Sequence, residues 1–320
     1  MTLVIRWAVL VLLVLAPSFF PTAYAQDYPN KPIRIIVGPG PDIVARIFGQ
    51  KFTEAWGQQA IVETRPGGGG AIATDLVAKA APDGYTLLLA SAAYTINHVL
   101  QPNSFNLIRD FSAVAFCASA PLILLVHPSM PVRSVQEFIA LAKSRPGQIN
   151  YASSGNGTPN HLAGELLKSM ARIDIVHVPY KSAAPATIDI IGGQVQMYFA
   201  ITSIAVGHVQ AGRVRGLGVT SPQRSPFAPD LPTLAESGLP GYQVIAWNGL
   251  LAPAGTPRGV VSKINGEVQR SLKQADVLQR LKDSYYEPAP VFTPEQYTDY
   301  IRLEIAKWAK LVKETGLKVD

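Results

Sequence analysis

The chain has 320 residues, of which 48% are hydrophobic and 16% are charged. This balance excludes disordered and fibrous proteins and fits about two globular domains. The formal net charge is +6, but the lysines and arginines are scattered, so the sequence shows no basic patch of the kind that binds nucleic acid. A mild positive excess is compatible with an anionic small ligand.

The N-terminal segment has the layout of a secretory signal peptide. Arg6 precedes an apolar run over residues 7–16, and the small residues AYA at 23–25 predict cleavage before Gln26. The alternative is a membrane anchor, but the apolar run is well short of the ~20 residues that a spanning helix needs. We therefore expect residues 1–25 to direct export to the periplasm.

The sequence contains one cysteine, Cys117. Its position far downstream excludes a lipid-modified cysteine directly after the signal, so we expect a protein that is not lipid-anchored. A single cysteine also excludes an internal disulfide, although an oxidising compartment would permit one. Cys117 is most simply a small buried apolar side chain.

The first part of the mature chain alternates between apolar strands and amphipathic helices. The expected elements are a strand at 33–37, a helix at 42–56, a strand at 61–63, a small-residue helix at 71–80 and a strand at 86–90. This alternation is typical of parallel sheets that are covered by helices.

A second series of the same kind begins near residue 122. The expected strands are at 122–127, 149–152, 175–178, 197–199 and 214–219, and the expected helices at 134–143, 159–170 and 184–191. Ser134 and Glu137 form a capping-box pattern at the first of these helices. The proline-rich stretch at 222–240 indicates a loop.

The C-terminal part has an extended run at 242–252 and two helices, near 257–272 and 293–315, the second opened by a Thr293/Gln296 capping box. These helices lack a sheet of their own, so we expect the chain to return and pack them on the first unit. The sequence therefore predicts two lobes with crossings near residues 126 and 244. Lobe 1 would comprise 26–126 and 245–320, and lobe 2 would comprise 127–244.

Four turns lie between the end of a strand and the start of a helix, at 38–41, 65–70, 153–158 and 180–183. Ligands of α/β proteins bind at the carboxyl ends of the strands. Helix N-termini there present unpaired N–H groups and the positive end of the helix dipole, which suit a carboxylate or phosphate. The alternative for each turn is a tight glycine connection without a ligand.

The loop SSGNGT at 153–158 is the most informative of these turns. Thr158 is placed to cap a helix, and Ser153, Ser154 and Asn156 supply short polar groups. The loop does not match the Gly-x-Ser-x-Gly nucleophile elbow, and no phosphate-binding glycine motif occurs at a strand end. The five histidines are far apart and form no metal motif. We interpret the loop as a binding loop without catalytic function and expect no metal.

Three further residues keep two interpretations each. Tyr180 and Lys181 either line the cleft and meet an anion, or are a core tyrosine and a solvated lysine. Trp247, in the extended run near the second crossing, either forms an apolar wall of the pocket or fills the core. Asp42 is expected to cap its helix.

Seven motifs together resemble the Bug family, the periplasmic solute receptors of tripartite tricarboxylate transporters. The motifs are PNKPIR at 29–34, ETRPG at 63–67, AAPDGYTLL at 80–88, YASSGNG at 151–157, HVPYK at 177–181, GGQVQM at 192–197 and LAPAGTP at 251–257. They span nearly all of the mature chain.

This resemblance implies an α/β, type II periplasmic-binding-protein fold with a hinge between two lobes and a ligand cleft between them. It implies capture of a small carboxylate by a monomeric receptor, delivery to membrane permease subunits, no enzymatic activity and no cofactor. From this resemblance and from the four turns we expect the ligand-binding residues to be Gly38, Gly40, Asp42, Gly69, Ser91, Ser153, Ser154, Asn156, Gly157, Thr158, His161, Tyr180, Lys181, Ala200 and Trp247.

Two positions depart from the family pattern. The first turn, Gly38 to Pro41, is shorter by about four residues than the family's usual glycine-rich turn, a length change that loops tolerate. Ala200 stands where the family commonly has an aspartate, which argues against an amino-acid ligand.

Two alternative functions remain: an exported sensor or weakly binding receptor, and an exported α/β hydrolase, for which no nucleophile motif is present.

Overall fold

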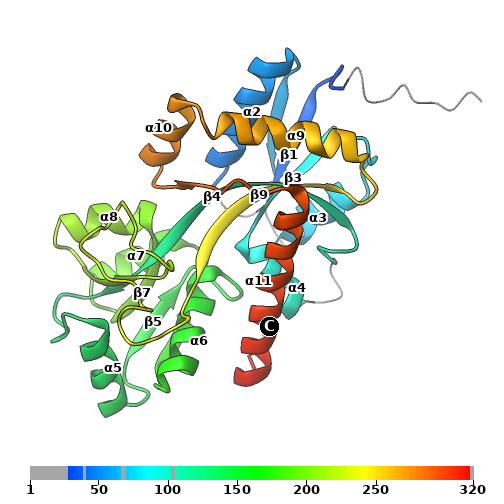
Figure 1. Cartoon of the computed structure of the whole chain (residues 1–320). Helices are drawn as coiled ribbons and strands as arrows, with labels where there is room; N and C mark the ends of the chain where they lie inside the picture. Colours follow the sequence, from blue (N-terminus) through cyan, green and yellow to red (C-terminus); the bar gives the residue numbers. More distant parts are fainter. Residues whose placement is uncertain (1–27, 39–40, 66–69, 102–104, 318–320) are drawn as a thin grey trace, which may run out of the picture.

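The computed structural model describes residues 28–38, 41–65, 70–101 and 105–317, so the expected signal peptide lies outside the described residues. The chain forms two α/β lobes that are joined by long strands (Figure 1). Each lobe has its own buried apolar core. No helix in the described part is long and apolar enough to cross a membrane.

The first lobe is built on three parallel strands. β1 (Ile33–Val37) lies between β2 (Ala60–Thr64) and β3 (Thr86–Ser91) and pairs with both. The nearly continuous apolar run of β1 suits a strand that is covered on both faces. The helices of this lobe are α2 (Ile43–Trp56), α3 (Ala71–Ala78), α4 (Ala92–Leu100), α9 (Arg258–Ser271) and α10 (Ala275–Asp283). The structure adds α4 and α10, which the sequence pattern did not indicate.

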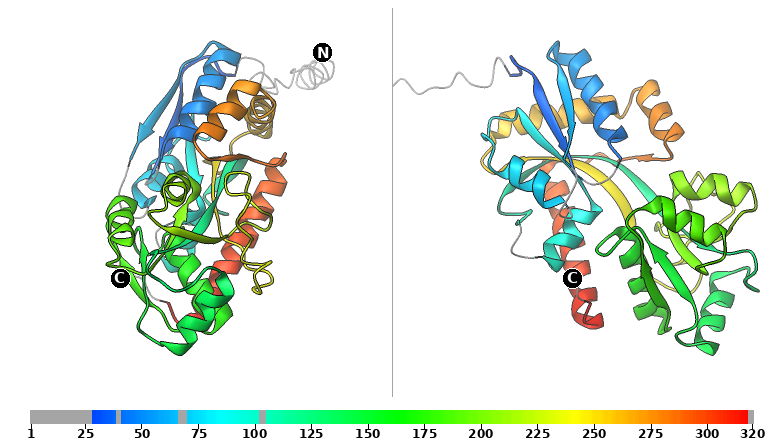
Figure 2. Two further views of the ribbon diagram at one scale, coloured as in Figure 1. Left: turned by 90° about the vertical axis from the view of Figure 1, so that its left-hand side faces the viewer. Right: turned by 180° about the vertical axis from the view of Figure 1, so that it is seen from behind.

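Two long strands carry the chain between the lobes. β4 (Phe111–Val126) pairs antiparallel with β9 (Ile245–Pro253) from Phe111 as far as Pro121, and β9 also pairs with β3. The remainder of β4, from Leu122, pairs with strands of the second lobe. The chain therefore changes lobe at Pro121, before the expected crossing near residue 126, because one strand of 16 residues serves both sheets (Figure 2).

The second lobe repeats the parallel arrangement. Its strands are β5 (Asn150–Ser153), which pairs in parallel with both β6 (Val176–Pro179) and β7 (Met197–Ile201), and β8 (Arg215–Val219), which pairs with β4. Its helices are α5 (Val135–Ser144), α6 (Pro159–Ala171), α7 (Ala183–Ile191) and α8 (Thr202–Gln210). Side chains of α5 and α6 share one apolar cluster with the sheet, and those of α7 and α8 share another. All the expected elements of this lobe are present, and α8 is an addition.

The last helix, α11 (Pro294–Thr315), belongs to both lobes. Tyr297 and Ile301 lie in the core of the first lobe, whereas Trp308 and Leu311 lie in the core of the second. The expectation that the C-terminal helices pack on the first lobe therefore describes only the first half of α11, because its apolar stripe continues past that lobe. β10 (Glu287–Pro288), the strand before α11, pairs with β4.

The two predicted capping boxes differ in the structure. At α11, Thr293 Oγ1 accepts the Gln296 N–H and the Gln296 side chain accepts the Thr293 N–H, so this box is complete. At α5, Ser134 Oγ accepts the Glu137 N–H, but the Glu137 carboxylate accepts the N–H of Arg133 instead of that of Ser134. The second box is therefore half formed.

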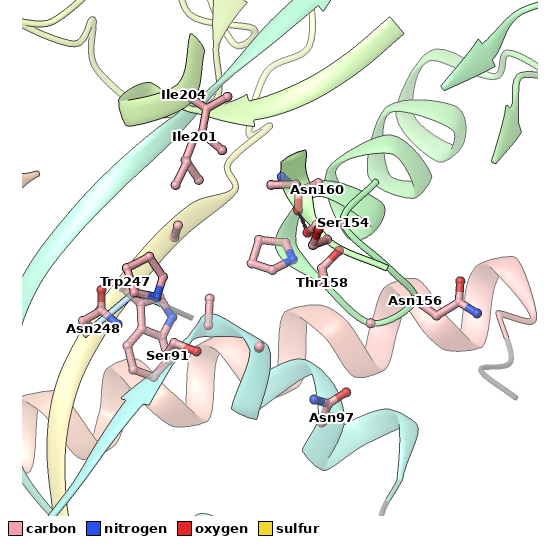
Figure 3. A pocket seen from close by; sticks show the side chains of 18 of the residues that line it. Ser91, Asn97, Ser154, Asn156, Thr158, Asn160, Ile201, Ile204, Trp247 and Asn248 are labelled. Atoms are coloured by element: carbon pink, nitrogen blue, oxygen red, sulfur yellow. Dashed lines mark hydrogen bonds between the residues drawn. The ribbon is translucent and has the colours of Figure 1, made fainter. Parts of the chain in front are cut away.

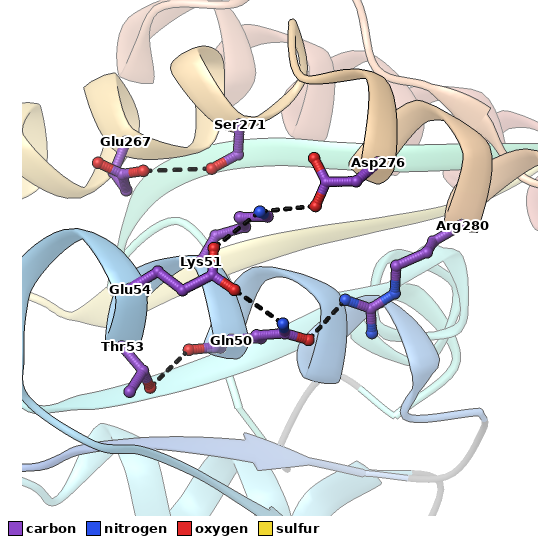
Figure 4. Close-up of polar contacts among 9 residues, drawn as sticks. Gln50, Lys51, Thr53, Glu54, Glu267, Ser271, Asp276 and Arg280 are labelled. Atoms are coloured by element: carbon purple, nitrogen blue, oxygen red, sulfur yellow. Dashed lines mark hydrogen bonds and ion pairs between the residues drawn. The ribbon is translucent and has the colours of Figure 1, made fainter.

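A mostly buried lysine links α2 to α10 on the outer side of the first lobe. Lys51 Nζ lies 2.6 Å from Asp276 Oδ2 and 2.8 Å from Glu54 Oε2 (Figure 4). Hydrogen bonds to Asp276 and Glu54 raise the pKa of Lys51, so it stays charged. Beside it, Arg280 donates a hydrogen bond to Gln50. This cluster fixes α10 against α2 and lies apart from the pocket described next.

Candidate functional site

A pocket of about 450 Å³ lies between the two lobes. Its walls come from β3, β9 and the first turn on one side, and from the β5–α6 loop, α7 and α8 on the other. Seven of the residues proposed from the sequence line it: Ser91, Ser154, Asn156, Gly157, Thr158, Lys181 and Trp247. Figure 3 shows Ser154, Thr158 and Asn160 on one side of the pocket and Trp247 and Asn248 on the other, with Ile201 and Ile204 beside them.

Four helices begin at this pocket. Their N-cap residues are Ser91 for α4, Thr158 for α6, Ser182 for α7 and Ile201 for α8, and all four line the pocket. None of these N-cap side chains bonds the N–H groups of its first turn. The backbone donors and positive dipole ends of four helices from both lobes therefore remain available to an anion in the pocket.

The β5–α6 loop is held by hydrogen bonds within itself. Ser153 Oγ and Thr158 Oγ1 both donate to the Gly155 carbonyl, with distances of 3.1 and 2.7 Å. Gly155 has φ 128° and Gly157 has φ 70°, a left-handed backbone that glycine adopts without strain. Ser154 Oγ lies 2.5 Å from Asn160 Oδ1, to which it donates. The predicted N-cap position of Thr158 is confirmed, but its hydroxyl closes the loop and does not cap the helix.

Behind the loop, two histidines stack against each other. The rings of His161 and His177 are 3.9 Å apart at an interplanar angle of 12°, and His161 Nδ1 accepts the Gly157 N–H. Burial lowers the pKa of each histidine to about 4, so both are neutral at pH 7. His161 therefore supports the loop from behind and does not contact the pocket.

Ser153 also lies behind the loop. Its Oγ is 2.6 Å from His177 Nε2, a distance typical of a nucleophile and its base. Ser153 is buried and does not line the pocket, however, so its hydroxyl does not meet a substrate there. The pair therefore fastens β5 to β6 and gives no support to a hydrolase.

The first turn contributes Val37 and Pro41 to the pocket. Gly38 is buried behind them, and a Cβ at this position would lie 2.0 Å from the Tyr94 hydroxyl, so the tyrosine occupies the space beside the turn. Asp42 stands at the N-cap position of α2, but its carboxylate accepts hydrogen bonds from Arg46 and does not cap the helix. Gly40 and Gly69 lie outside the described residues.

The open interpretations of the remaining proposed residues are resolved in different ways. The Tyr180 hydroxyl donates to Asp189 Oδ2 at 2.6 Å and does not line the pocket, whereas Lys181 does. Trp247 fits both of its interpretations, because it lines the pocket and its indole also packs on the Phe116 ring. Ala200 is fully buried in the apolar cluster with α7 and α8, beneath the pocket wall.

The sequence interpretation missed much of the pocket wall. The additional lining residues are Val37, Pro41, Leu89, Ala92, Ala93, Asn97, Pro159, Asn160, Ser182, Ala183, Tyr198, Ile201, Ile204, Ala246, Asn248 and Tyr286. Ala92, Ala93 and Asn97 belong to α4 and Ile204 belongs to α8, two helices whose starts have no sequence signal of their own. Asn160 and Ser182 lie next to proposed residues at the starts of helices. That position is the one feature of the sequence that could have indicated that they line the pocket. The described residues contain no group of three or more side chains suited to a metal ion.

Comparisons with known proteins agree with this architecture. The family model described as tripartite tricarboxylate transporter family receptor matches residues 44–317. Protein BugT of Bordetella pertussis is 33% identical over 302 residues, which cover 92% of this chain and 92% of that protein.

Two solved structures also match over nearly their whole length. R. palustris Rpa4515 with adipate is 32% identical, covers 91% of this chain and 99% of its own, and has a TM-score of 0.81. MatC from Rhodopseudomonas palustris with bound malate is also 32% identical, covers 89% of this chain and 100% of its own, and has a TM-score of 0.77.

These findings confirm the predicted two-lobed periplasmic-binding fold and the resemblance to Bug proteins. They also confirm the expectation of a receptor without enzymatic activity, because the matched family consists of transporter receptors. The chain belongs to the tripartite tricarboxylate transporter receptor family.

Proposed function

We propose that this protein is a periplasmic receptor that captures a small carboxylate between its lobes and delivers it to the permease subunits of a tripartite tricarboxylate transporter. The observation that carries the proposal is the convergence of four helix N-termini, without side-chain caps, on one interlobe pocket. Such termini bind carboxylates through backbone N–H groups. The relatives that are named with adipate and with malate support the same ligand class.

The remaining parts of the proposal follow from the receptor role. An exported chain without a lipid anchor would work in the periplasm as a diffusible monomer, because each chain holds both walls of its own pocket. Closure of the lobes around the ligand would then create the form that the permease recognises, as hinge closure does in other binding proteins.

A thermal-shift screen tests the ligand class. We expect at least one mono- or dicarboxylate to raise the melting temperature by several degrees, because a ligand at 100 times its Kd stabilises the folded state by about 2.7 kcal/mol. The matched control for each compound is its neutral amide, which the helix termini should not hold. Equal shifts with acids and amides, or no shift with any acid, would contradict a carboxylate receptor.

A charge placed in the pocket gives a second control. Ala93 lies in the first turn of α4 and lines the pocket, whereas Ala275 opens α10 outside it. An acidic residue in a first turn favours a helix, so Ala93→Asp and Ala275→Asp should both fold. Only Ala93→Asp should lose the ligand-induced shift. Loss of the shift in both variants would point to a general effect of the added charge.

Trp247 should report ligand binding directly. It lines the pocket, whereas Trp56 and Trp308 do not, so saturation with ligand should change the tryptophan emission of the wild-type protein. In Trp247→Phe the emission change should disappear while the thermal shift persists in reduced form. An emission change of full size in this variant would place the ligand away from β9.

A further inference from the structure

Two buried hydrogen-bond donors in the pocket wall have no partner among the described residues. Tyr198 on β7 is 0% exposed and Trp247 on β9 is 1% exposed, and both line the pocket. The hydroxyl of Tyr198 and the indole N–H of Trp247 are bonded to no other described group. Buried polar groups in native proteins are almost always hydrogen-bonded, because an unmet donor costs about 1–3 kcal/mol. The pocket wall therefore contains two donors that a ligand with an acceptor atom could satisfy.

The chemistry of these donors restricts what they can bind. An indole N–H only donates, and a phenol donates through its one hydrogen. Burial also raises the pKa of Tyr198, so it keeps its proton at neutral pH. A matching ligand atom must then be an acceptor, such as a carbonyl, hydroxyl or carboxylate oxygen.

The charges around the pocket favour a neutral acceptor. Lys181 is the one charged side chain among the described residues that line the pocket, and it lies at the start of α7 with an exposed side chain. Leu89, Ile201 and Ile204 supply apolar surface to the wall. A second carboxylate buried against such surface would lack a countercharge, which is costly. The helix termini and Lys181 therefore attract the carboxylate end of the ligand, and the apolar surface suits an uncharged body.

We propose that Tyr198 and Trp247 set the ligand specificity of this receptor by donating hydrogen bonds to a neutral oxygen on the apolar body of a monocarboxylate. The inference rests on the proposed function, because the helix termini must hold the carboxylate. It assigns the ligand to the hydroxy- or oxo-substituted monocarboxylic acids, with an aliphatic or aromatic body that fits about 450 Å³.

Calorimetric titration with two matched series tests the proposal. The aliphatic series is hexanoate, 6-hydroxyhexanoate and adipate, and the aromatic series is benzoate, 4-hydroxybenzoate and terephthalate. In the series that fits the pocket, the hydroxy acid should bind about tenfold more tightly than the unsubstituted acid, as one satisfied buried donor would give. It should also bind more tightly than the dicarboxylate.

Tyr198→Phe should remove most of this preference. The variant keeps the ring and loses only the unpartnered hydroxyl, so it should fold, and its affinity should fall more for the hydroxy acid than for the unsubstituted acid. Tyr297→Phe is the matched control, because the Tyr297 hydroxyl is also buried and without a partner among the described residues but lies outside the pocket. It should leave the preference unchanged.

The possible outcomes separate this inference from the proposed function. If the unsubstituted acid or the dicarboxylate binds most tightly, or if Tyr198→Phe keeps the full preference, the inference is overturned and the carboxylate receptor stands. The same holds if neither series binds while another carboxylate gives a thermal shift. If no carboxylate binds in either experiment, the proposed function fails and the inference fails with it.

Discussion

Acidification from pH 6.5 toward pH 4 should destabilise the folded protein by up to about 1.4 kcal/mol per pH unit through His161 alone. This histidine is 2% exposed, and burial lowers its pKa from 6.5 to about 4. Unfolded chains bind the proton near pH 6.5, whereas the folded chain resists it until about pH 4. His177, whose pKa is also lowered to about 4 by burial and by His161, should add a smaller amount because it is partly exposed.

The direction of this destabilisation and its pH range follow from the protonation of the folded and unfolded states. Above pH 6.5 both states carry neutral histidine, so the full stability is present. As the pH falls, the unfolded state takes up more protons, so its free energy falls relative to that of the folded state. Paired carboxylates such as Glu63, whose pKa is lowered by its hydrogen bonds with Arg34, act later, below their unfolded value of 4.5. The interval from pH 6.5 to 4.5 is therefore the one in which His161 and His177 lower the stability of the fold.

Urea unfolding at pH 7, 6 and 5 measures the effect. His161→Gln should lower the slope of stability against pH in this interval, whereas Glu63→Gln should leave that slope unchanged and act only at lower pH. Stability that stays level from pH 7 to pH 5 in the wild-type protein would show that the stacked pair accepts a proton without loss of the fold.

Gly164→Ala should destabilise the protein by about 2 kcal/mol or more, although alanine is favoured over glycine in helices by about 1 kcal/mol. A Cβ at Gly164, within α6, would lie 2.2 Å from the ring of Tyr151. That ring has little room to move, because its hydroxyl donates to Glu165 Oε1 at 2.6 Å and its face packs on His177. Ligand affinity should fall as well, since His177 holds Ser153 at the base of the binding loop.

Gly266→Ala provides the matched control. Gly266 lies within α9, and a Cβ there would meet no atom within 4 Å, so this change should stabilise the protein by about 0.5–1 kcal/mol. Chemical denaturation of both variants measures the contrast. Equal stability of the two variants would show that Tyr151 can leave its place without cost.

The strands and most helices could be predicted because their apolar spacing reflects burial directly. The helices α4, α8 and α10 could not, and for α4 and α8 the reason is local. Ala92 follows Ser91 of β3 directly, and Thr202 follows Ile201 of β7 directly. No glycine or proline separates strand from helix at these two joins, so the usual signal for a change of element is missing.

The candidate site was predictable where glycines mark it and less so elsewhere. The β5–α6 loop stands out by Gly155 and Gly157, and most of its polar residues line the pocket. Ser153 was proposed with them, yet strand alternation places its side chain on the same face as Tyr151, under α6. Tyr198 lines the pocket but was not proposed from the sequence. Nothing near it in the sequence distinguishes it from a core tyrosine, because only the approach of the first lobe turns its surroundings into a pocket.

The helix α11 restricts how the two lobes can move. Tyr297 near its start and Trp308 near its end are each fully buried, in different cores. Rotation about an axis far from α11 would draw one of these rings into water, at a cost of roughly 2–3 kcal/mol. The pivot of any opening must therefore pass close to this helix. The two lobes should therefore open by rotating about an axis that runs along α11, so that the pocket widens while the distance between Tyr297 and Trp308 stays constant.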